Sequence, residues 1–374
     1  MPVAATDLVP PPQVLARRAR LRYTCDDEEG IHRIVRAKRV TYQDASGHVI
    51  HDRRQLTRIE SLGIPPAWTD VWICVSERGH LQATGRDARG RKQYLYHAEW
   101  HLHAGRTKFK KLRAFGEALA SLRQQVARHL RKPGLPQEKV IAAVIALLDG
   151  TLVRVGNEEY AKANGSYGLT TLRDHHADVR GPTIHLQFKG KSGKMLEIDF
   201  RDQRLARIVR ECQDLPGQQL FQYLDSEGDL HRLESADVNR YLRAVTGCPF
   251  TAKDFRTWKA TVLVLERLLN EESARSATAA RRAVSQAIRA AAEALGNTVT
   301  VCRKYYVHPQ VTQLFLADKL ARLCGSVPPP KRRLNSYEQL LLRLLRKLET
   351  WKGHSNAERA GIRFARALFG GELS

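Results

Sequence analysis

A pair of tyrosines near the end of the sequence lies among cations in a pattern that could do phosphate chemistry. Tyr305 and Tyr306 directly follow Arg303 and Lys304, and the amide side chain of Asn297 stands a few residues upstream. A phenol becomes a nucleophile once it loses its proton, and positive neighbours stabilise the negative transition state at phosphorus. Taken alone, the stretch favours a plainer interpretation, a basic helix with one tyrosine packed inward and the other in solvent.

Four cations earlier in the chain could complete such a site. Arg154 follows an apolar helical run, although a surface ion pair with Glu158 at helical spacing is the alternative. Lys191 falls at the tip of an expected hairpin, where a lysine can be held toward a ligand but is more often only solvated. Lys253 and Arg256 are three residues apart and therefore share one face of an expected helix.

The densest basic patch of the N-terminal half, residues 85–101, mixes cations with aromatic residues and an amide. Arg91, Gln93, Tyr94 and Tyr96 follow one another there, and the two tyrosines share one face if the segment is extended. Basic groups contact phosphates, and an amide beside aromatic rings suits contacts with bases or sugars. An edge strand carrying its usual charges explains the pattern about as well.

Strands and tight turns are expected to carry this N-terminal patch. Residues 41–50 and residues 71–84 each alternate like strands around turn residues, which predicts two hairpins. Pro65 and Pro66 predict a stiff loop between them, because fixed φ angles do not suit the centre of a sheet. The character of the sequence changes near residue 104, where we expect a domain boundary.

Helices are expected to carry the other candidates. Apolar residues recur at spacings of three and four over residues 112–130, which predicts a helix that ends before Pro133. Residues 183–188 and 194–200 alternate around a turn, which predicts a β-hairpin inside an otherwise helical domain. Further helices are expected at residues 140–148, 204–212, 236–246, 251–269, 271–295 and 337–351.

These elements predict an α+β fold, with a small β-rich N-terminal domain and a larger, mainly α-helical domain that contains a β-hairpin. The expected divisions are a flexible leader at 1–19, the β-rich domain at 20–104, the helical domain at 105–325, and a basic linker, helix and tail at 326–374.

The overall charge points to a polyanionic partner. The 374 residues carry a formal net charge of +23 and a pI near 10.1, a surplus that usually serves nucleic acid. Solubility or attraction to a membrane surface is the alternative that charge leaves open. Six scattered cysteines predict reduced thiols and no metal site. The sequence shows neither a signal peptide nor an apolar span, so we expect a cytoplasmic protein.

The candidate residues occur in a recognisable order, namely Arg154, Lys191, Lys253, Arg256, Asn297 and Tyr306. Further matching segments are 64–68, 71–74, 79–97, 154–164, 168–173 and 302–309. In this order and in these segments, over roughly residues 20 to 325, the sequence resembles the type IB DNA topoisomerases of the poxvirus and bacterial kind.

The resemblance implies a clamp around double-stranded DNA and relaxation of supercoils by transient cleavage of one strand, without ATP, cofactor or metal. Tyr306 would attack a phosphodiester and form a covalent 3′-phosphotyrosyl link that frees a 5′-hydroxyl. Arg154, Arg256 and Asn297 would bind the non-bridging oxygens of that phosphate.

The resemblance also implies roles for the remaining candidates. Lys191 would act as the general acid that protonates the departing 5′ oxygen, with Lys253 helping. The residues that would hold DNA from the opposite side are Arg91, Gln93, Tyr94 and Tyr96.

The sequence departs from the family pattern near the tyrosines. Asn297 stands where poxvirus members have histidine, and as a neutral donor it cannot shuttle protons. Val299 stands where proline is common, which would loosen the turn. The choice of Tyr306 over Tyr305 depends on its distance from Asn297. We therefore predict a loop or turn at residues 296–299, because one continuous helix would direct the two tyrosines to different faces.

Two alternatives stay open at this point. A tyrosine recombinase or integrase shares the Arg, Lys, Arg and Tyr chemistry, but its N-terminal domain would be helical and it would normally show a His-x-x-Arg pattern where Lys253 precedes Arg256. A non-catalytic basic DNA-binding protein could keep the same scaffold. The expected partner is double-stranded DNA, with no membrane or small-molecule partner. One chain is enough to close a clamp, so we expect a monomer at the bacterial nucleoid.

Overall fold

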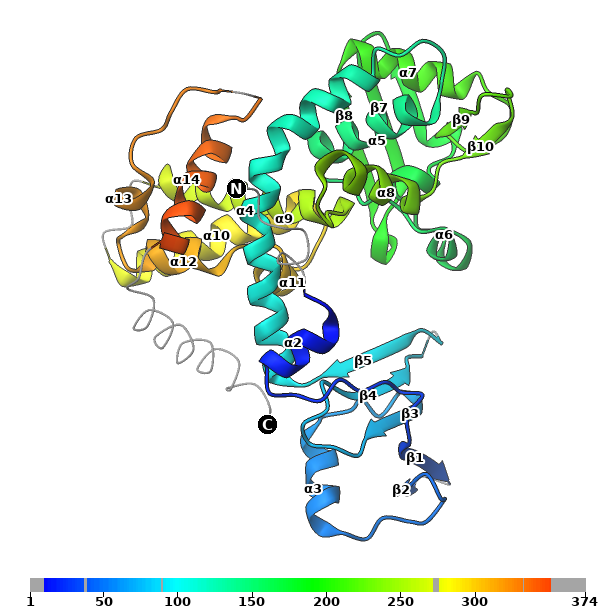
Figure 1. Cartoon of the computed structure of the whole chain (residues 1–374), viewed down its shortest axis with the longest axis vertical. Helices are drawn as coiled ribbons and strands as arrows, with labels where there is room; N and C mark the ends of the chain where they lie inside the picture. Colours follow the sequence, from blue (N-terminus) through cyan, green and yellow to red (C-terminus); the bar gives the residue numbers. More distant parts are fainter. Residues whose placement is uncertain (1–9, 37–38, 89, 272–275, 332, 351–374) are drawn as a thin grey trace. The chain divides into compact units, whose positions relative to one another are not determined.

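The computed structural model of the chain describes residues 10–36, 39–88, 90–271, 276–331 and 333–350 (Figure 1). The chain folds as two units, Met1–Lys110 and Lys111–Ser374. The first unit is rich in strands and the second in helices. This confirms the predicted mixed fold, with a β-rich N-terminal region and a helical domain.

The first unit is built on a five-stranded antiparallel sheet with the order β2-β1-β3-β4-β5. Its strands are β1 (Gly30–Arg36), β2 (Arg39–Gln43), β3 (Thr69–Cys74), β4 (Leu81–Arg86) and β5 (Lys92–Tyr96). Ile31 and Ile73 of the sheet pack with Ile59 of helix α3 (Arg53–Ser61) to form the core. Burial of these apolar side chains is the main force that holds the unit together.

The two predicted hairpins of the first unit have different outcomes. The hairpin at residues 71–84 is confirmed by the pairing of β3 with β4. The hairpin at residues 41–50 is only partly formed, because a single bridge joins Gln43 to Val49 and the main partner of β2 is β1. Asp44 makes the turn, since its carboxylate accepts from two backbone N–H groups of the loop.

A short helix, α2 (Pro12–Arg18), corrects the expectation of a flexible leader at residues 1–19. Proline suits the first helical turn, because the N–H that it lacks would have no partner there. Leu15 and Ala16 are buried, and Ala16 belongs to an apolar cluster that includes Trp100. This packing orders part of a segment whose prolines suggest a loop. The first nine residues of that leader lie outside the described residues.

Helix α4 (Ala98–His129) starts earlier than the helix expected at residues 112–130 and runs through the boundary expected at residue 104. The division between the two units falls after Lys110 instead. Gly105 suggests a break in the sequence, but one glycine inside a helix costs only about 1 kcal/mol relative to alanine.

The second unit holds most of the helices in the described part of the chain. After α4 they are α5 (Gln137–Thr151), α6 (Glu158–Asn164), α7 (Gln203–Gln213), α8 (Ser235–Thr246), α9 (Ala252–Leu269), α10 (Ala277–Leu295), α11 (Val299–Tyr305), α12 (Pro309–Leu316), α13 (Leu320–Cys324) and α14 (Ser336–Thr350). Helix α9 contacts α5, α8, α10, α12 and α14. Its Trp258 and Phe255 are buried against Phe115 of α4.

Two small sheets accompany these helices. The predicted hairpin is formed by β7 (Thr183–Lys189) and β8 (Met195–Arg201), and a third strand, β6 (Ala177–Arg180), pairs with β7. A separate hairpin consists of β9 (Gln222–Leu224) and β10 (Leu230–Arg232). The expectation of one hairpin in this domain is thus corrected, because strands of three or four residues are too short to show a clear alternation.

The C-terminal helix α14 packs into the second unit. It lies where the leucine pattern predicts a helix, and Leu340, Leu341 and Leu344 are fully buried. The helix contacts α9 and α13. The predicted tail from residue 352 onward lies outside the described residues.

Candidate active site

Two helices of the second unit end where Arg154 and Asn297 meet. Helix α5 is followed by a left-handed residue, Leu152 (φ 61°), and α10 is followed by a left-handed glycine, Gly296 (φ 60°). Glycine suits this conformation because it lacks a Cβ. Just beyond these turns, Nη2 of Arg154 donates a hydrogen bond to Oδ1 of Asn297. The contact brings two residues that are far apart in the sequence into one site.

The side chain of Arg256 joins both of these helix ends to α9. Arg256 is only 4% exposed. One terminal nitrogen donates to the carbonyl of Leu152, and the other donates to the carbonyl of Leu295 over 2.7 Å. Carbonyls at helix C-termini lack partners within their own helix, so they are natural acceptors for this guanidinium.

Burial opposes positive charge at this site. Desolvation lowers the pKa of Arg256 to about 10, with the charge of Arg154 as the next cause, and desolvation also lowers the pKa of Arg154. Tyr306 acts in the opposite direction on the pKa of both arginines. A bound anion would stabilise two desolvated cations that lie this close, so the site is electrostatically suited to a phosphate.

Two buried donors at the site have no hydrogen-bond partner among the described residues, namely Nε of Arg256 and Nδ2 of Asn297. A buried donor left unpaired costs about 1–3 kcal/mol. The amide oxygen of Asn297 already accepts from Arg154, so its nitrogen is the atom left to donate. Both donors therefore remain without an acceptor in the described part of the chain.

The structure distinguishes the two neighbouring tyrosines. Tyr306 lies just beyond α11 and is 9% exposed, whereas Tyr305 is 40% exposed, with the ammonium of Lys304 5.3 Å from its ring centre. The backbone carbonyl of Tyr306 accepts from the buried hydroxyl of Thr261 on α9 over 3.1 Å. The ring of Tyr306 lies beside the guanidinium of Arg256. Tyr306 is thus the tyrosine that the fold holds next to the arginines.

The predicted break before the tyrosine helix is confirmed. Helix α10 ends at Leu295, residues 296–298 leave the helix, and α11 starts at Val299. The hydroxyl of Thr298 caps α11 by accepting from the N–H of Val301 over 3.3 Å. Val299 occupies the first helical position, which also suits proline, and the cap forms with valine in that place.

A cavity of about 250 Å³ connects three of the candidate cations. Arg154, Lys191 and Arg256 all line it. Lys191 lies in the turn between β7 and β8, as predicted, and its ammonium nitrogen is 6.0 Å from the ring centre of Tyr160 on α6. The structure therefore groups these three cations around one cavity, although Arg154 and Arg256 are 102 positions apart in the sequence.

Lys253 is placed differently from Arg256. It lies one turn earlier on α9 with an exposed side chain, and it is not among the residues that line the cavity. Lys253 and Arg256 therefore differ in burial, although they lie three residues apart on the same helix. The role of Lys253 in proton transfer stays a prediction.

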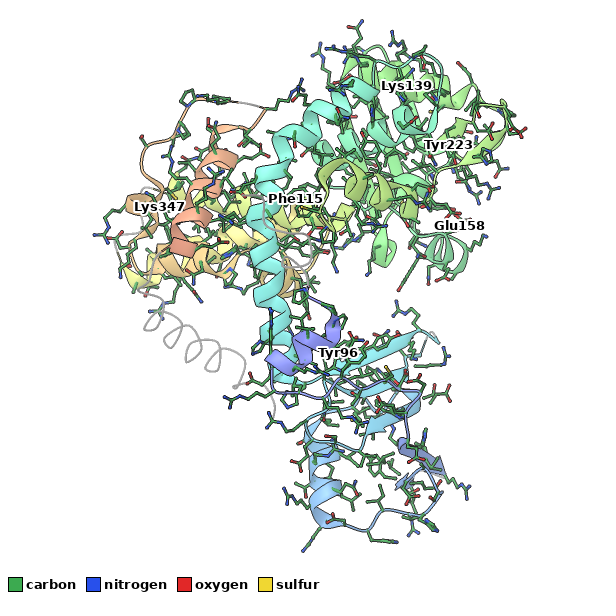
Figure 2. All side chains as sticks on the ribbon, viewed as in Figure 1. Tyr96, Phe115, Lys139, Glu158, Tyr223 and Lys347 are labelled. Carbon is green, nitrogen blue, oxygen red and sulfur yellow. The ribbon has the colours of Figure 1, made fainter. Side chains whose placement is uncertain are left out.

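In the first unit, the four N-terminal candidates lie on β5 or directly before it. Tyr94 and Tyr96 stack with their ring centres 6.1 Å apart, which confirms that they share one face (Tyr96 is labelled in Figure 2). Arg91 and Gln93 both contact the carboxylate of Asp87, at 2.7 Å and 2.9 Å. Sequence reasoning did not identify Asp87, although an aspartate four residues before an arginine across a glycine turn is a signal for such a contact.

Three other groups that shape the site were missed from the sequence. The carbonyls of Leu152 and Leu295 are backbone atoms, so no residue type marks them. The hydroxyl of Thr261 lies on the apolar side of α9, where it bonds to the backbone of Tyr306. A lone threonine in an apolar run is only a weak signal of a buried hydroxyl.

Both units match families of known proteins. The family model described as "Eukaryotic DNA topoisomerase I, catalytic core" matches residues 97–322. The model described as "Bacterial DNA topoisomerase IB, N-terminal domain" matches residues 39–87.

Comparison with individual proteins also finds DNA topoisomerases. The chain is 32% identical over 295 residues to DNA topoisomerase 1B of Acanthamoeba polyphaga mimivirus, which covers 77% of this chain and 88% of the viral protein. It is 28% identical over 223 residues to DNA topoisomerase 1 of Mycosarcoma maydis, covering 53% of this chain and 22% of that protein. It is 20% identical over 267 residues to DNA topoisomerase I of Monkeypox virus, covering 68% of this chain and 80% of that protein.

These matches favour neither a tyrosine recombinase nor a non-catalytic DNA-binding protein. They extend over both units, and the longest family match includes Arg154, Lys191, Arg256, Asn297 and Tyr306. On these grounds the chain belongs to the type IB DNA topoisomerase family.

Proposed function

We propose that the chain relaxes supercoiled DNA by cleaving one strand and rejoining it, with Tyr306 as the nucleophile of a covalent 3′-phosphotyrosyl intermediate. The observation that carries the proposal is the single cavity lined by Arg154, Lys191 and Arg256, with Tyr306 packed against Arg256. Membership of the family and the net charge of +23 support DNA as the substrate.

The chemistry is a balanced exchange of phosphodiester bonds. The phenol oxygen of Tyr306 attacks phosphorus, a bond from phosphorus to tyrosine forms, and the bond from phosphorus to the 5′ oxygen breaks. The phenolic proton leaves to solvent, and Lys191 gives a proton to the departing 5′ oxygen. General acid catalysis of this kind contributes about a hundredfold or more. Rejoining reverses these steps and conserves the bond energy, so no ATP is needed.

The unpaired donors stabilise the charge that develops on the phosphate. Arg256 is held by two backbone carbonyls and offers Nε, while Asn297 offers its amide N–H as a neutral donor. Arg154, oriented by Asn297, supplies the second positive charge. Removing one preorganised donor of this type typically costs about 10²–10³-fold in rate.

The remaining candidates act around this centre. Lys253 assists proton transfer from the exposed turn of α9. The first unit contacts the DNA backbone and sugars, and the two units close around the duplex as a clamp. The exposed ring of Tyr94 supports such a contact. The proposed DNA-contacting residues of that unit are Arg91, Gln93, Tyr94 and Tyr96.

We further propose that a single chain acts on double-stranded DNA in the bacterial cytoplasm, at the nucleoid. The match of residues 39–87 to a bacterial domain supports the bacterial assignment, since the relatives named above are viral and fungal. In the described part of the chain, no helix combines the length and apolarity needed to cross a bilayer.

Relaxation of a supercoiled plasmid by catalytic amounts of protein, in EDTA and without ATP, tests the activity. Tyr306→Phe should abolish both relaxation and the covalent adduct but leave salt-sensitive DNA binding. Tyr305→Phe is the matched control and should relax DNA normally. An adduct mapped to Tyr305, or to a 5′ end, would contradict the proposal. Sequence-specific strand exchange in place of relaxation would favour a recombinase.

A further inference from the structure

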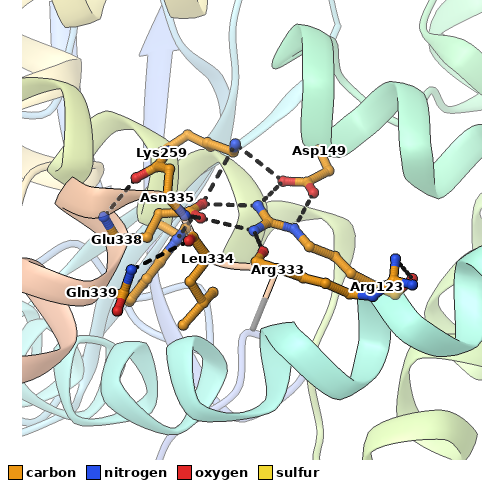
Figure 3. A network of polar contacts seen from close by, with 9 residues as sticks. Arg123, Asp149, Lys259, Arg333, Leu334, Asn335, Glu338 and Gln339 are labelled. Carbon is orange, nitrogen blue, oxygen red and sulfur yellow. Dashed lines mark hydrogen bonds and ion pairs between the residues drawn. The ribbon is translucent and has the colours of Figure 1, made fainter. Parts of the chain in front are cut away.

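A buried carboxylate connects the C-terminal helix to the helices of the active site. Glu338 in the first turn of α14 is 1% exposed. Its two oxygens accept hydrogen bonds from both terminal nitrogens of Arg123, each over 2.8 Å (Figure 3). One of these oxygens also accepts from the indole N–H of Trp258 over 3.2 Å. Glu338 therefore ties α14 to both α4 and α9.

The same arginine extends the contacts to the end of α5. Nε and one terminal nitrogen of Arg123 bind the two oxygens of Asp149, at 2.6 Å and 2.9 Å. The ammonium of Lys259 on α9 lies 3.3 Å from Asp149 and 3.6 Å from Glu338. Figure 3 shows these two positive and two negative groups as one network, which joins four helices.

The two central members of this network, Glu338 and Arg123, are held in their charged forms. Burial opposes ionisation of Glu338, but the hydrogen bonds from Arg123 lower its pKa to about 2. Burial likewise opposes the charge of Arg123, and its bonds to Glu338 and Asp149 raise its pKa in spite of that. Removing one partner would leave an uncompensated buried charge, so the surrounding helices would have to shift.

The network holds the same two elements that Arg256 joins. Asp149 lies three residues before Leu152, whose carbonyl accepts from Arg256. Lys259 lies three residues after Arg256 on α9. A shift between the end of α5 and α9 would therefore alter the Arg256 hydrogen bond to Leu152 and the spacing between Arg256 and Arg154.

We propose that Glu338 is a positioning residue for Arg154 and Arg256. Helix α14, which lies beyond the residues 97–322 matched by the topoisomerase core, holds α5 and α9 in the geometry that the transition state needs. This inference rests on the function proposed above. Misplacement of a catalytic group by about 1 Å can cost roughly 10²-fold in rate. A residue that lies far from the phosphate can therefore still affect the cleavage rate.

Single-turnover cleavage of duplex DNA by excess enzyme tests the proposal, with DNA affinity and thermal unfolding measured in parallel. Glu338→Gln keeps the side-chain shape but removes its charge. Asp149→Asn weakens the network at its other end and leaves Glu338 bound to Arg123 and Trp258. Each variant should lower the cleavage rate at saturation about tenfold or more, with the DNA dissociation constant unchanged within about twofold. The double variant should be no slower than the slower single one, because both act through one chain of contacts.

The matched control is Glu117→Gln. Glu117 of α4 accepts from Arg346 of α14 over 3.0 Å at a more exposed position. It therefore links the same two helices without reaching Asp149. An ion pair of this kind contributes little to stability, so this variant should change the cleavage rate by less than about twofold.

Two results would overturn the inference. One is a wild-type cleavage rate for both Glu338→Gln and Asp149→Asn at a temperature where both are folded. The other is an equal loss of rate for Glu117→Gln. If Glu338→Gln does not fold, Asp149→Asn decides alone, because its α14 contacts are intact. An inactive wild-type protein would instead count against the proposed function, so the two failures are distinguishable.

Discussion

The guanidinium carbon of Arg256 lies 5.4 Å from the centre of the Tyr306 ring, and the two residues belong to segments that Thr261 joins by a buried hydrogen bond. Arg256 also binds the carbonyls that close two other helices. The residue proposed to stabilise the transition state thus also fixes the backbone around it. A substitution can therefore separate the effect of the positive charge of Arg256 from the effect of its hydrogen bonds.

Arg256→Lys should lower the single-turnover cleavage rate by roughly 10²-fold or more, although the positive charge is kept. A lysine carries its three donors on one nitrogen, so it cannot replace the separate nitrogens with which the guanidinium binds Leu152 and Leu295 and still offers Nε. DNA affinity should change little. Arg281→Lys, the same replacement at an exposed position of α10, is the control and should cleave normally. A fast Arg256→Lys enzyme would show that charge alone is enough.

Asn297→Asp should be slower than Asn297→Ala. Alanine removes one neutral donor, which should cost about 10²-fold in cleavage rate. Aspartate would also place a negative charge near the phosphate and neutralise Arg154, its partner in the free protein. Rate constants at saturating enzyme give the order of the two variants. Equal rates would mean that this side chain does not face the phosphate.

Thr261→Val should destabilise the fold more than Thr261→Ser. The single hydroxyl proton lies within hydrogen-bond distance of two carbonyls, that of Thr257 at 2.8 Å and that of Tyr306 at 3.1 Å, and the hydroxyl oxygen accepts from the N–H of His308 over 3.2 Å. Valine has the same shape but leaves those backbone groups unpaired, so the free energy of unfolding should fall by about 1–3 kcal/mol. Serine keeps the hydroxyl and should cost about 1 kcal/mol for the lost methyl group. Denaturant titration measures both, and a more stable valine variant would contradict the assignment.

Acid should destabilise the protein in two separate pH windows. Burial lowers the pKa of His308 to about 4 from 6.5, so the unfolded chain takes up this proton first. Its contribution to stability is therefore complete above pH 6.5 and is lost as the pH falls toward 4. Glu338, with a pKa lowered to about 2 from 4.5, keeps its contribution above pH 4.5 and loses it toward pH 2.

Two variants should separate these windows when the free energy of unfolding is measured as a function of pH. His308→Asn keeps an acceptor for the N–H of Gln310 and should weaken the pH dependence only in the upper window, to which His176 also contributes because burial lowers its pKa to about 4. Glu338→Gln should weaken the pH dependence of the free energy of unfolding only in the lower window. A change in the same window for both variants would show that other groups control the acid response.

The sequence predicted those features that local rules determine. The turn that carries Lys191 follows from the hairpin pattern around two glycines, and it is present. The break after Gly296 follows from the distance between Asn297 and the tyrosines, and it is present as well. The choice of Tyr306 over Tyr305 depends on its distance from Asn297, and in the structure Tyr306 lies beside Arg256.

Features that depend on tertiary packing could not be predicted in this way. Spacing places Lys253 and Arg256 on one helix face, but packing buries one and exposes the other. The contact of Glu338 with Arg123 spans 215 residues, and no pattern within either helix encodes it. Ala16 is similar, because its burial depends on a partner, Trp100, far along the chain.

The unpaired donors of Arg256 and Asn297 have a consequence for how such a protein can evolve. Each unpaired donor destabilises the resting fold by about 1–3 kcal/mol, and under the proposed function each donates to the phosphate. Selection for heat resistance and selection for turnover therefore act in opposite directions on Asn297, whereas Arg256 is also needed for its hydrogen bonds to Leu152 and Leu295. A library of variants selected only for thermal tolerance should accumulate replacements at Asn297, and a library selected for relaxation should retain the asparagine.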